Sequence, residues 1–425
     1  MTSWDIEHVR SRFPSLQRTG PDGEPVAWLD GPAGTQVVDR CLDATGAYLR
    51  TSNSNHGGAF PPSRETDELV DAVRGALADL LGAADADEVS FGANMTTITF
   101  ALSRAIGAMS APGDEIVVTR LEHDANVAPW LAVARERDLR IRWVGFHADD
   151  GTLDLEELAD ALSPRTRLVA VGLASNALGT INPVARIAEM AHLVDAWVWV
   201  DAVHAAPHLP IDIGSLGADF LVCSAYKFYG PHLGMLWGRR ELLESLPPYH
   251  VRPAGDAIPG RFETGTQAHE LIAGLGGTLA YLEEVGISQA GGPGPPGASD
   301  GLRRARLMGA LEAARRYEST LVWQLIERVG AVRGVRIRGI TDPARAAERC
   351  PTIAFTLDGH HPAEVARFLG QRGIFVWDGD YYAWELIRSL GLAESGGMVR
   401  IGLVQYNTIS EVERVGTALD ELVAA

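Results

Sequence analysis

Apolar and polar positions follow two different rhythms between residues 86 and 240. Short apolar runs rich in β-branched and aromatic residues are separated by longer stretches whose apolar residues recur at helical spacing. The short runs predict strands at 88–91, 115–119, 140–144, 168–173, 196–201, 220–223 and 234–238. The longer stretches predict helices at 97–106, 127–136, 155–162 and 184–193. This order predicts an α/β domain in which helices cover both faces of a largely parallel sheet.

The last third of the chain has a different pattern. A Gly- and Pro-rich segment at 286–301 predicts a flexible surface connection. Beyond it we expect a helix at 302–329, strands at 335–340, 352–357, 374–377 and 399–403, and helices at 362–372 and 410–422. The predicted organisation is a large domain at 21–285 and a smaller α+β domain at 302–425, with residues 1–20 packed against the smaller domain.

Composition and charge narrow the classes of function. The chain has 425 residues, of which 46% are apolar and 22% charged, as in an ordinary globular enzyme. Its net charge of −18 argues against nucleic acid or an anionic membrane as a partner. The scattered cysteines Cys41, Cys223 and Cys350 form neither a metal-binding spacing nor a disulfide framework. Since the first residues also lack the pattern of a signal peptide, we expect a cytoplasmic protein.

The candidate chemistry starts from Lys227, which follows the apolar run 219–223 in the sequence Ser-Ala-Tyr-Lys-Phe-Tyr-Gly. An amine at the end of a buried strand loses solvation, which favours its neutral form. A neutral lysine is a nucleophile for carbonyl groups, as a Schiff base with pyridoxal phosphate requires. The alternative is a lysine that only extends from a strand end towards solvent.

Other residues at expected strand ends fit the same cofactor. Asp201 ends an apolar strand, where its carboxylate can keep a pyridine nitrogen protonated, and a helix N-cap is the alternative. Thr96 and Thr97 open a predicted helix, and Ser224 lies three residues before the lysine. Hydroxyl and free N–H groups at a helix N-terminus bind phosphate, although threonine at such a position is more often a simple cap.

Three histidines have more than one interpretation. His123 follows the predicted strand 115–119 and can lie flat against a cofactor ring, or belong to a surface loop. His204 and His208 are four residues apart, but no third ligand accompanies them, so no metal site is predicted. A dinucleotide-binding fingerprint is also missing, because the glycines at 274–277 lie inside a helical pattern and not after a strand.

Together these residues resemble the class V aminotransferase family of fold-type I pyridoxal-phosphate enzymes, and most of all its cysteine desulfurase-like branch. The resemblance covers nearly the whole chain and rests on the segments 28–35, 122–126, 175–180, 201–204, 224–231, 264–267 and 405–408, and on Arg400. It implies an α/β large domain with a mostly parallel seven-stranded sheet, a smaller α+β C-terminal domain, and pyridoxal 5′-phosphate as cofactor.

The resemblance also implies roles for the matching residues. Lys227 would carry the cofactor and later move the Cα proton of the substrate. His123 would stack on the cofactor ring, and Asp201 would pair with the ring nitrogen. Asn176 would contact the ring hydroxyl or the substrate carboxylate, and Arg400 would bind that carboxylate in a bidentate manner.

For the phosphate group, the resemblance implies hydroxyl ligands from Thr96, Thr97 and Ser224. The threonine matching Thr266 reaches the cofactor phosphate of the neighbouring subunit in this family, which implies a homodimer. His204 and Tyr226 stand where the family usually has Gln and His. Both exchanges keep a hydrogen-bonding group beside the cofactor.

One departure from the family bears directly on the reaction. Cysteine desulfurases carry a cysteine on a mobile loop of the small domain, which takes the sulfur as a persulfide. The matching segment here, 377–384, reads Trp-Asp-Gly-Asp-Tyr-Tyr-Ala-Trp and has no cysteine. Its residues Asp380, Tyr381 and Tyr382 are candidate walls of a pocket for a bulkier polar substrate. Simple packing of the small domain is the alternative.

These observations predict a pyridoxal-phosphate-dependent C–S β-lyase that cleaves cysteine or an S-substituted cysteine to a thiol, pyruvate and ammonia. Related enzymes occur in pathways to sulfur-containing antibiotics, including lincosamides, so a role in natural-product biosynthesis is expected. Decarboxylating oxidative deamination of an S-cysteinyl conjugate, desulfurase-like activity and epimerisation stay open. A catalytically silent scaffold is disfavoured, because Lys227, Asp201 and Arg400 occur together.

Overall fold

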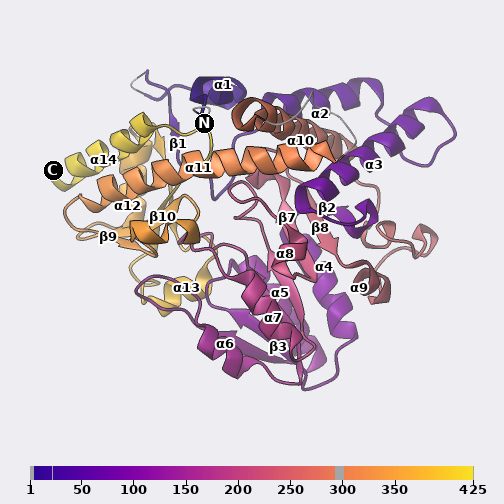
Figure 1. Cartoon of the computed structure of the whole chain (residues 1–425). Helices are drawn as coiled ribbons and strands as arrows, with labels where there is room; N and C mark the ends of the chain where they lie inside the picture. The colour runs from indigo at the N-terminus through magenta and orange to yellow at the C-terminus, as the bar shows by residue number, and fades with distance from the viewer. Residues whose placement is uncertain (1–3, 22, 292–300, 425) are drawn as a thin grey trace.

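A seven-stranded sheet forms the centre of the larger part of the molecule (Figure 1). The computed structural model describes residues 4–21, 23–291 and 301–424. The strand order is β2-β8-β7-β6-β5-β3-β4, and only β8 runs antiparallel to its neighbours. The strands are β2 (Val89–Gly92), β3 (Glu115–Thr119), β4 (Arg140–Val144), β5 (Thr166–Gly172), β6 (Trp197–Asp201), β7 (Phe220–Ser224) and β8 (Gly234–Gly238). The largely parallel sheet predicted from the apolar runs is thereby confirmed.

Both faces of this sheet are buried because helices pack on each of them, and successive strand residues point to opposite faces. Trp199 of β6 packs with α4 and α5 on one face, whereas Val198 and Val200 belong to the core formed with α3, α7 and α10 on the other. The helices around the sheet are α2 (Asp39–Thr51), α3 (Pro61–Leu81), α4 (Met95–Ala108), α5 (Ala128–Arg137), α6 (Leu155–Ala161), α7 (Val184–His192), α8 (Ile213–Leu216), α9 (Arg240–Ser245) and α10 (His269–Ala290).

The smaller C-terminal part contains a four-stranded antiparallel sheet of order β12-β13-β10-β9. The long helix α11 leads into it and lies along α10 (Figure 1). Its elements are α11 (Leu302–Gly330), β9 (Val335–Arg338), β10 (Thr352–Leu357), α12 (Pro362–Gly370), β11 (Ile374–Phe375), β12 (Trp377–Gly379), α13 (Trp384–Ser389), β13 (Met398–Gly402) and α14 (Ile409–Ala424). The predicted α+β character of this part is confirmed.

The N-terminal segment is tied to the C-terminal part. The Trp4 indole donates a hydrogen bond to the Gln405 carbonyl at 3.2 Å, and Arg10 of α1 (Ile6–Ser11) pairs with Glu411 at 3.0 Å. Strand β1 (Ala27–Trp28) then pairs in parallel with β11, so the N-terminal segment packs on the smaller part before the chain continues into the large sheet.

The expected connection at 286–301 begins later than its composition indicates. Helix α10 continues to Ala290, and Gly291 ends it in the left-handed conformation that glycine adopts readily. The segment 292–300 lies outside the described residues, so flexibility there stays a prediction. In the part of the chain that is described, no helix is both long and apolar enough to cross a membrane.

Candidate active site

A cavity of about 420 Å³ lies at the carboxyl ends of β3, β5, β6 and β7. Functional groups gather at this edge of a parallel sheet because the loops of neighbouring strands meet there. The cavity is lined by most of the predicted site residues, namely Thr96, His123, Asn176, Asp201, His204, Ser224, Tyr226 and Lys227. The remaining predicted residues, Thr97, Thr266, Tyr381, Tyr382 and Arg400, lie outside its lining.

Lys227 follows β7 in a short 3-10 turn, and its amine turns towards the segment after β1. Its Nζ donates hydrogen bonds to the carbonyl oxygens of Pro32 at 2.5 Å and Ala33 at 3.2 Å. Burial, reinforced by the positive charge of Arg400, lowers the pKa of this amine to about 7, although the Asp201 carboxylate acts in the opposite direction. A substantial fraction of the amine is therefore neutral and nucleophilic at physiological pH.

Asp201 presents its carboxyl group at the end of β6. Its Oδ1 accepts a hydrogen bond from the Val203 N–H at 2.8 Å, so the residue does cap the following turn, as the alternative interpretation expects. Burial raises the pKa of this carboxyl to about 6, while the Val203 N–H and the positive charge of Lys227 favour its ionised form. The residue therefore caps a turn and also offers a carboxylate to the cavity.

The N-terminus of α4 meets the end of β7 at one side of the cavity. Ser224 Oγ accepts the Met95 N–H at 3.0 Å, and Thr96 lines the cavity beside it. Asn94 caps the helix, because its Oδ1 accepts both the N–H and the hydroxyl of Thr97 at 2.9 Å. The Thr97 hydroxyl is thus engaged in the cap.

A second cavity of about 350 Å³ shares one lining residue, His232, with the first. Thr97 and Thr266 both line this second cavity. The Tyr226 ring stacks on the His232 ring with centroids 4.9 Å apart. Thr266 therefore lies next to the catalytic cavity of its own chain without entering it.

His123 follows β3 and is neutral. Its Nδ1 accepts the Ala125 N–H at 3.1 Å, which leaves the proton of the neutral ring on Nε2. Burial, with the positive charges of Lys227 and Arg400, lowers the pKa of this imidazole to about 3. The ring of Tyr382 stacks on it at 5.3 Å between centroids. An uncharged, flat imidazole suits stacking on an aromatic ligand.

Tyr381 supports Arg400 and does not form a wall of the cavity. Its ring lies 4.5 Å from the Arg400 guanidinium carbon, and its hydroxyl donates to the Met398 carbonyl in the same strand as the arginine. The Tyr381 carbonyl accepts the Asn176 Nδ2–H at 2.9 Å, and the Asn176 carbonyl accepts from Arg400 at 2.9 Å. Burial lowers the pKa of Arg400 to about 10, so the guanidinium keeps its charge at neutral pH.

The loop 377–384 is fastened beside the cavity by hydrogen bonds from Asp124 and Asn176 to its backbone carbonyls. Tyr381 and Tyr382 have φ angles of 53° and 58°, a region that residues with side chains rarely adopt. The Tyr382 N–H donates to Asp380 Oδ1 at 2.9 Å, and the Tyr382 carbonyl accepts the Asp124 N–H at 2.7 Å. The side chain of Tyr382 is 70% exposed. It therefore covers His123 from the outside.

Three buried side-chain atoms of lining residues have no hydrogen-bond partner among the described residues: Asn176 Oδ1, Asn182 Oδ1 and His204 Nε2. Buried polar atoms normally find a partner, so this cavity is built for a polar ligand. His208, one turn on from His204, is instead hydrogen-bonded to Glu318 at 2.9 Å. With an amine, a carboxylate, a flat imidazole and hydroxyl groups around one space, the residues present fit pyridoxal phosphate.

The structure also shows lining residues to which the motifs gave no role. Glu122, Asn182 and His232 belong to the cavity wall. Glu122 belongs to the segment 122–126, which carries part of the resemblance and follows a buried strand by three residues, but no role was assigned to it. His232 lies in the cavity wall because β8 folds back antiparallel beside β7, and no local sequence pattern indicates this pairing.

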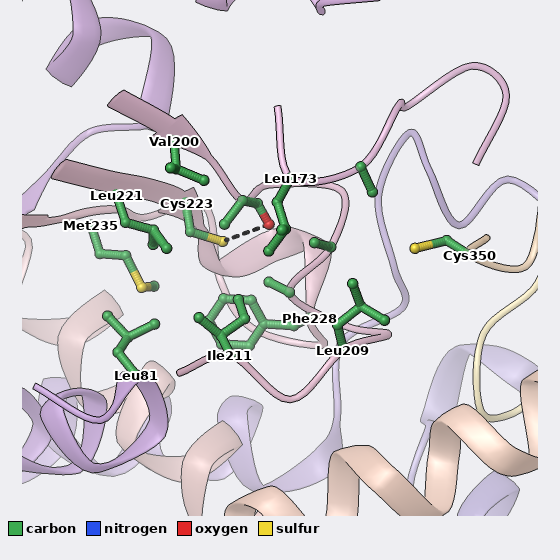
Figure 2. Close-up of a cluster of buried hydrophobic side chains, with 14 of the residues drawn as sticks. Leu81, Leu173, Val200, Leu209, Ile211, Leu221, Cys223, Phe228, Met235 and Cys350 are labelled. Carbon is green, nitrogen blue, oxygen red and sulfur yellow. Dashed lines mark hydrogen bonds between the residues drawn. The ribbon is translucent and has the colours of Figure 1, made fainter. Parts of the chain in front are cut away.

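The three cysteines are buried, and none lines the cavity within the described part of the chain. Figure 2 shows the Cys223 side chain among Leu221, Met235 and Phe228, on the core side of β7. Its Sγ lies 4.0 Å from the Ala202 carbonyl oxygen. Burial raises the pKa of the Cys223 and Cys350 thiols well above the ordinary value, which disfavours thiolates.

Comparison with known proteins agrees with this geometry. Residues 27–292 and 301–415 match the family model "Aminotransferase class-V". A probable cysteine desulfurase of Streptomyces coelicolor is 32% identical, over 98% of this chain and 97% of the relative. A cysteine desulfurase of Serratia proteamaculans is 33% identical, over 99% and 98%. The apo cysteine desulfurase structure from Thermococcus onnurineus has a TM-score of 0.82 at 26% identity, over 97% of this chain and 98% of that one. The chain therefore belongs to the class V aminotransferase family, as a fold-type I, pyridoxal-phosphate-dependent enzyme similar to cysteine desulfurases.

Proposed function

We propose that this enzyme is a C–S β-lyase that converts cysteine, or a cysteine with a substituent on sulfur, into a thiol, pyruvate and ammonia. The observation that carries the proposal is the loop 377–384. It contains no cysteine, and its backbone is hydrogen-bonded to Asn176 in the cavity wall and to Asp124 beside it. The buried thiols elsewhere are not positioned to receive sulfur.

The residues in the cavity support proton abstraction from a bound amino acid. Arg400, hydrogen-bonded to the Asn176 carbonyl beside the cavity, would bind the α-carboxylate, and the neutral amine of Lys227 would take the Cα proton. Asp201 would hold a proton on the cofactor's ring nitrogen, and neutral His123 would stack on the ring. Bound pyridoxal phosphate supplies the electron sink for the electron pair left at Cα.

Sulfur departs in the next step. The C–S bond breaks, the thiolate leaves with the bonding electrons, and a double bond forms between Cα and Cβ. Hydrolysis of the resulting enamine gives pyruvate and ammonia. Because a thiolate is a competent leaving group, this route needs no attacking protein thiol, whereas persulfide transfer requires one.

Product analysis tests this proposal. The holoenzyme is mixed with cysteine and with S-conjugated cysteines of increasing size, and products are identified by mass. We expect thiol and pyruvate in equal amounts, unchanged in a triple variant with Cys41, Cys223 and Cys350 each replaced by Ala. The Lys227→Ala variant serves as the inactive control.

Each of the other outcomes would reject the lyase. Alanine together with a protein persulfide would show desulfuration. Carbon dioxide with an aldehyde would show decarboxylating oxidative deamination, and an inverted α-centre would show epimerisation. A place in natural-product or antibiotic biosynthesis, and a cytoplasmic location, rest on the sequence alone and are proposed on that basis.

We also propose a homodimer in which Thr266 contacts the cofactor phosphate of the partner subunit. The position of Thr266 supports this, because it lines the second cavity, beside the catalytic cavity but outside it.

A further inference from the structure

Glu122 is a buried carboxyl group that none of the steps above uses. Its residue is only 3% exposed, yet it lines the catalytic cavity. The Thr119 hydroxyl donates to its Oε1 at 2.7 Å, and the Asn126 Nδ2–H donates to its Oε2 at 2.7 Å. The backbone N–H of Gly172 is a further donor.

All of these partners donate, and this pattern favours the ionised form of Glu122. The Thr119 hydroxyl already accepts the Leu121 N–H at 3.2 Å, which leaves its proton free to point at the carboxylate. A protonated carboxyl group would instead need an acceptor. Burial opposes ionisation and raises the pKa of Glu122 to about 7, so the donors offset part of a real desolvation cost.

Gly172 places this carboxyl group beside Asp201. It stands opposite Asp201 in the register of β5 and β6. A Cβ at Gly172 would lie 3.2 Å from Glu122 Oε2, so glycine allows the close approach. The negative charge of Asp201 in turn raises the pKa of Glu122, as expected for neighbouring carboxylates.

We infer that Glu122 is a second carboxylate behind Asp201. The negative charge of Glu122 stabilises a protonated nitrogen of the bound cofactor. Glu122 is thus a positioning residue that acts through its field and touches neither substrate nor reacting atoms. The groups that face it are Thr119 from β3, Asn126 from the following turn, Gly172 from β5 and Asp201 from β6. The inference rests on the cofactor and is independent of which bond the enzyme breaks.

The test is a pH titration of the visible absorption band of the holoenzyme, without substrate. Glu122→Gln keeps the shape, and its amide can donate to Thr119 Oγ1 while its carbonyl accepts from Asn126. Removal of the buried unit charge of Glu122, close to the cofactor, should lower the midpoint of this absorption titration by about one pH unit. The matched control is Glu88→Gln, a buried glutamate that accepts from the Trp237 indole at 3.0 Å and does not line the cavity.

An unchanged midpoint in Glu122→Gln, with cofactor bound in full amount, overturns the inference. Where that variant does not fold, Thr119→Val decides the matter. This variant removes one hydrogen-bond donor to the Glu122 carboxylate, which favours the neutral form of Glu122. It should therefore also lower the midpoint of the absorption titration. A Thr119→Val midpoint equal to that of the parent enzyme also overturns the inference. Failure of the lyase proposal would appear only in the product assay, so the two results are separable.

Discussion

Replacement of Tyr381 tests whether the loop 377–384 prepares Arg400 for substrate. The Tyr381 ring lies 4.5 Å from the guanidinium carbon, with Tyr381 7% and Arg400 4% exposed. A desolvated cation–π contact contributes about 2 kcal/mol, compared with about 0.5–1 kcal/mol at exposed sites. Tyr381→Leu removes that contact, so the guanidinium must be ordered again when the substrate carboxylate binds.

The expected result is an increase in KM. A loss of about 2 kcal/mol corresponds to about 30-fold, and we expect a rise of about 5- to 30-fold because part of the order is kept by the Asn176 carbonyl. If carboxylate binding is equal in the ground and transition states, kcat changes little. Steady-state kinetics with the best thiol-releasing substrate measure both constants.

Two neighbouring variants make the result specific. Tyr381→Phe keeps the ring and loses only the hydroxyl bond to the Met398 carbonyl, so it should lower stability by about 1 kcal/mol and leave KM near that of the parent enzyme. Tyr382→Leu loses an exposed stack on His123 and should leave KM for small substrates within about twofold. An unchanged KM in a folded, cofactor-loaded Tyr381→Leu enzyme would refute the reasoning.

Two further predictions follow from the cofactor site. The rate at which the apoenzyme binds pyridoxal phosphate covalently should rise as pH increases through about 7, because burial lowers the pKa of Lys227 to that value and only the neutral amine attacks. Absorbance measures this rate. A rate that is flat from about pH 6 to about pH 8 would contradict the prediction. Thr266→Val should weaken cofactor retention on dialysis by about 1–2 kcal/mol without loss of the dimer in light scattering, whereas a monomeric parent enzyme would exclude the contact across subunits.

The parallel strands were predictable because their burial is continuous. The apolar run that forms β6 is buried at Val198, Trp199 and Val200, so its sequence differs sharply from its surroundings. Its end at Asp201, and the end of β7 near Lys227, then place polar groups at one edge of the sheet. The presence of Asp201 and Lys227 in the lining of the catalytic cavity followed from that placement without knowledge of side-chain geometry.

Local sequence patterns did not predict the strand pairing in the small domain. The predicted strand 374–377 is divided in the structure, because β11 pairs with β1 whereas β12 pairs with β13. An apolar run does not record that its partner changes within it. The contact between Tyr381 and Arg400 was not predictable from local sequence either, because it depends on a left-handed backbone at Tyr381 and on a separate strand that carries Arg400.

The strained backbone of the loop 377–384 connects structure with reaction. Two successive non-glycine residues at positive φ cost of order 1–3 kcal/mol each, so the surrounding contacts must hold them. Those contacts end on Asn176, Asp124 and Arg400, at or beside the cavity. A swing of this loop would therefore remove the support of Arg400, the residue proposed to bind the substrate carboxylate. A loop held in this way suits the proposed lyase, which needs Arg400 kept in place, better than persulfide transfer, which needs a loop that moves.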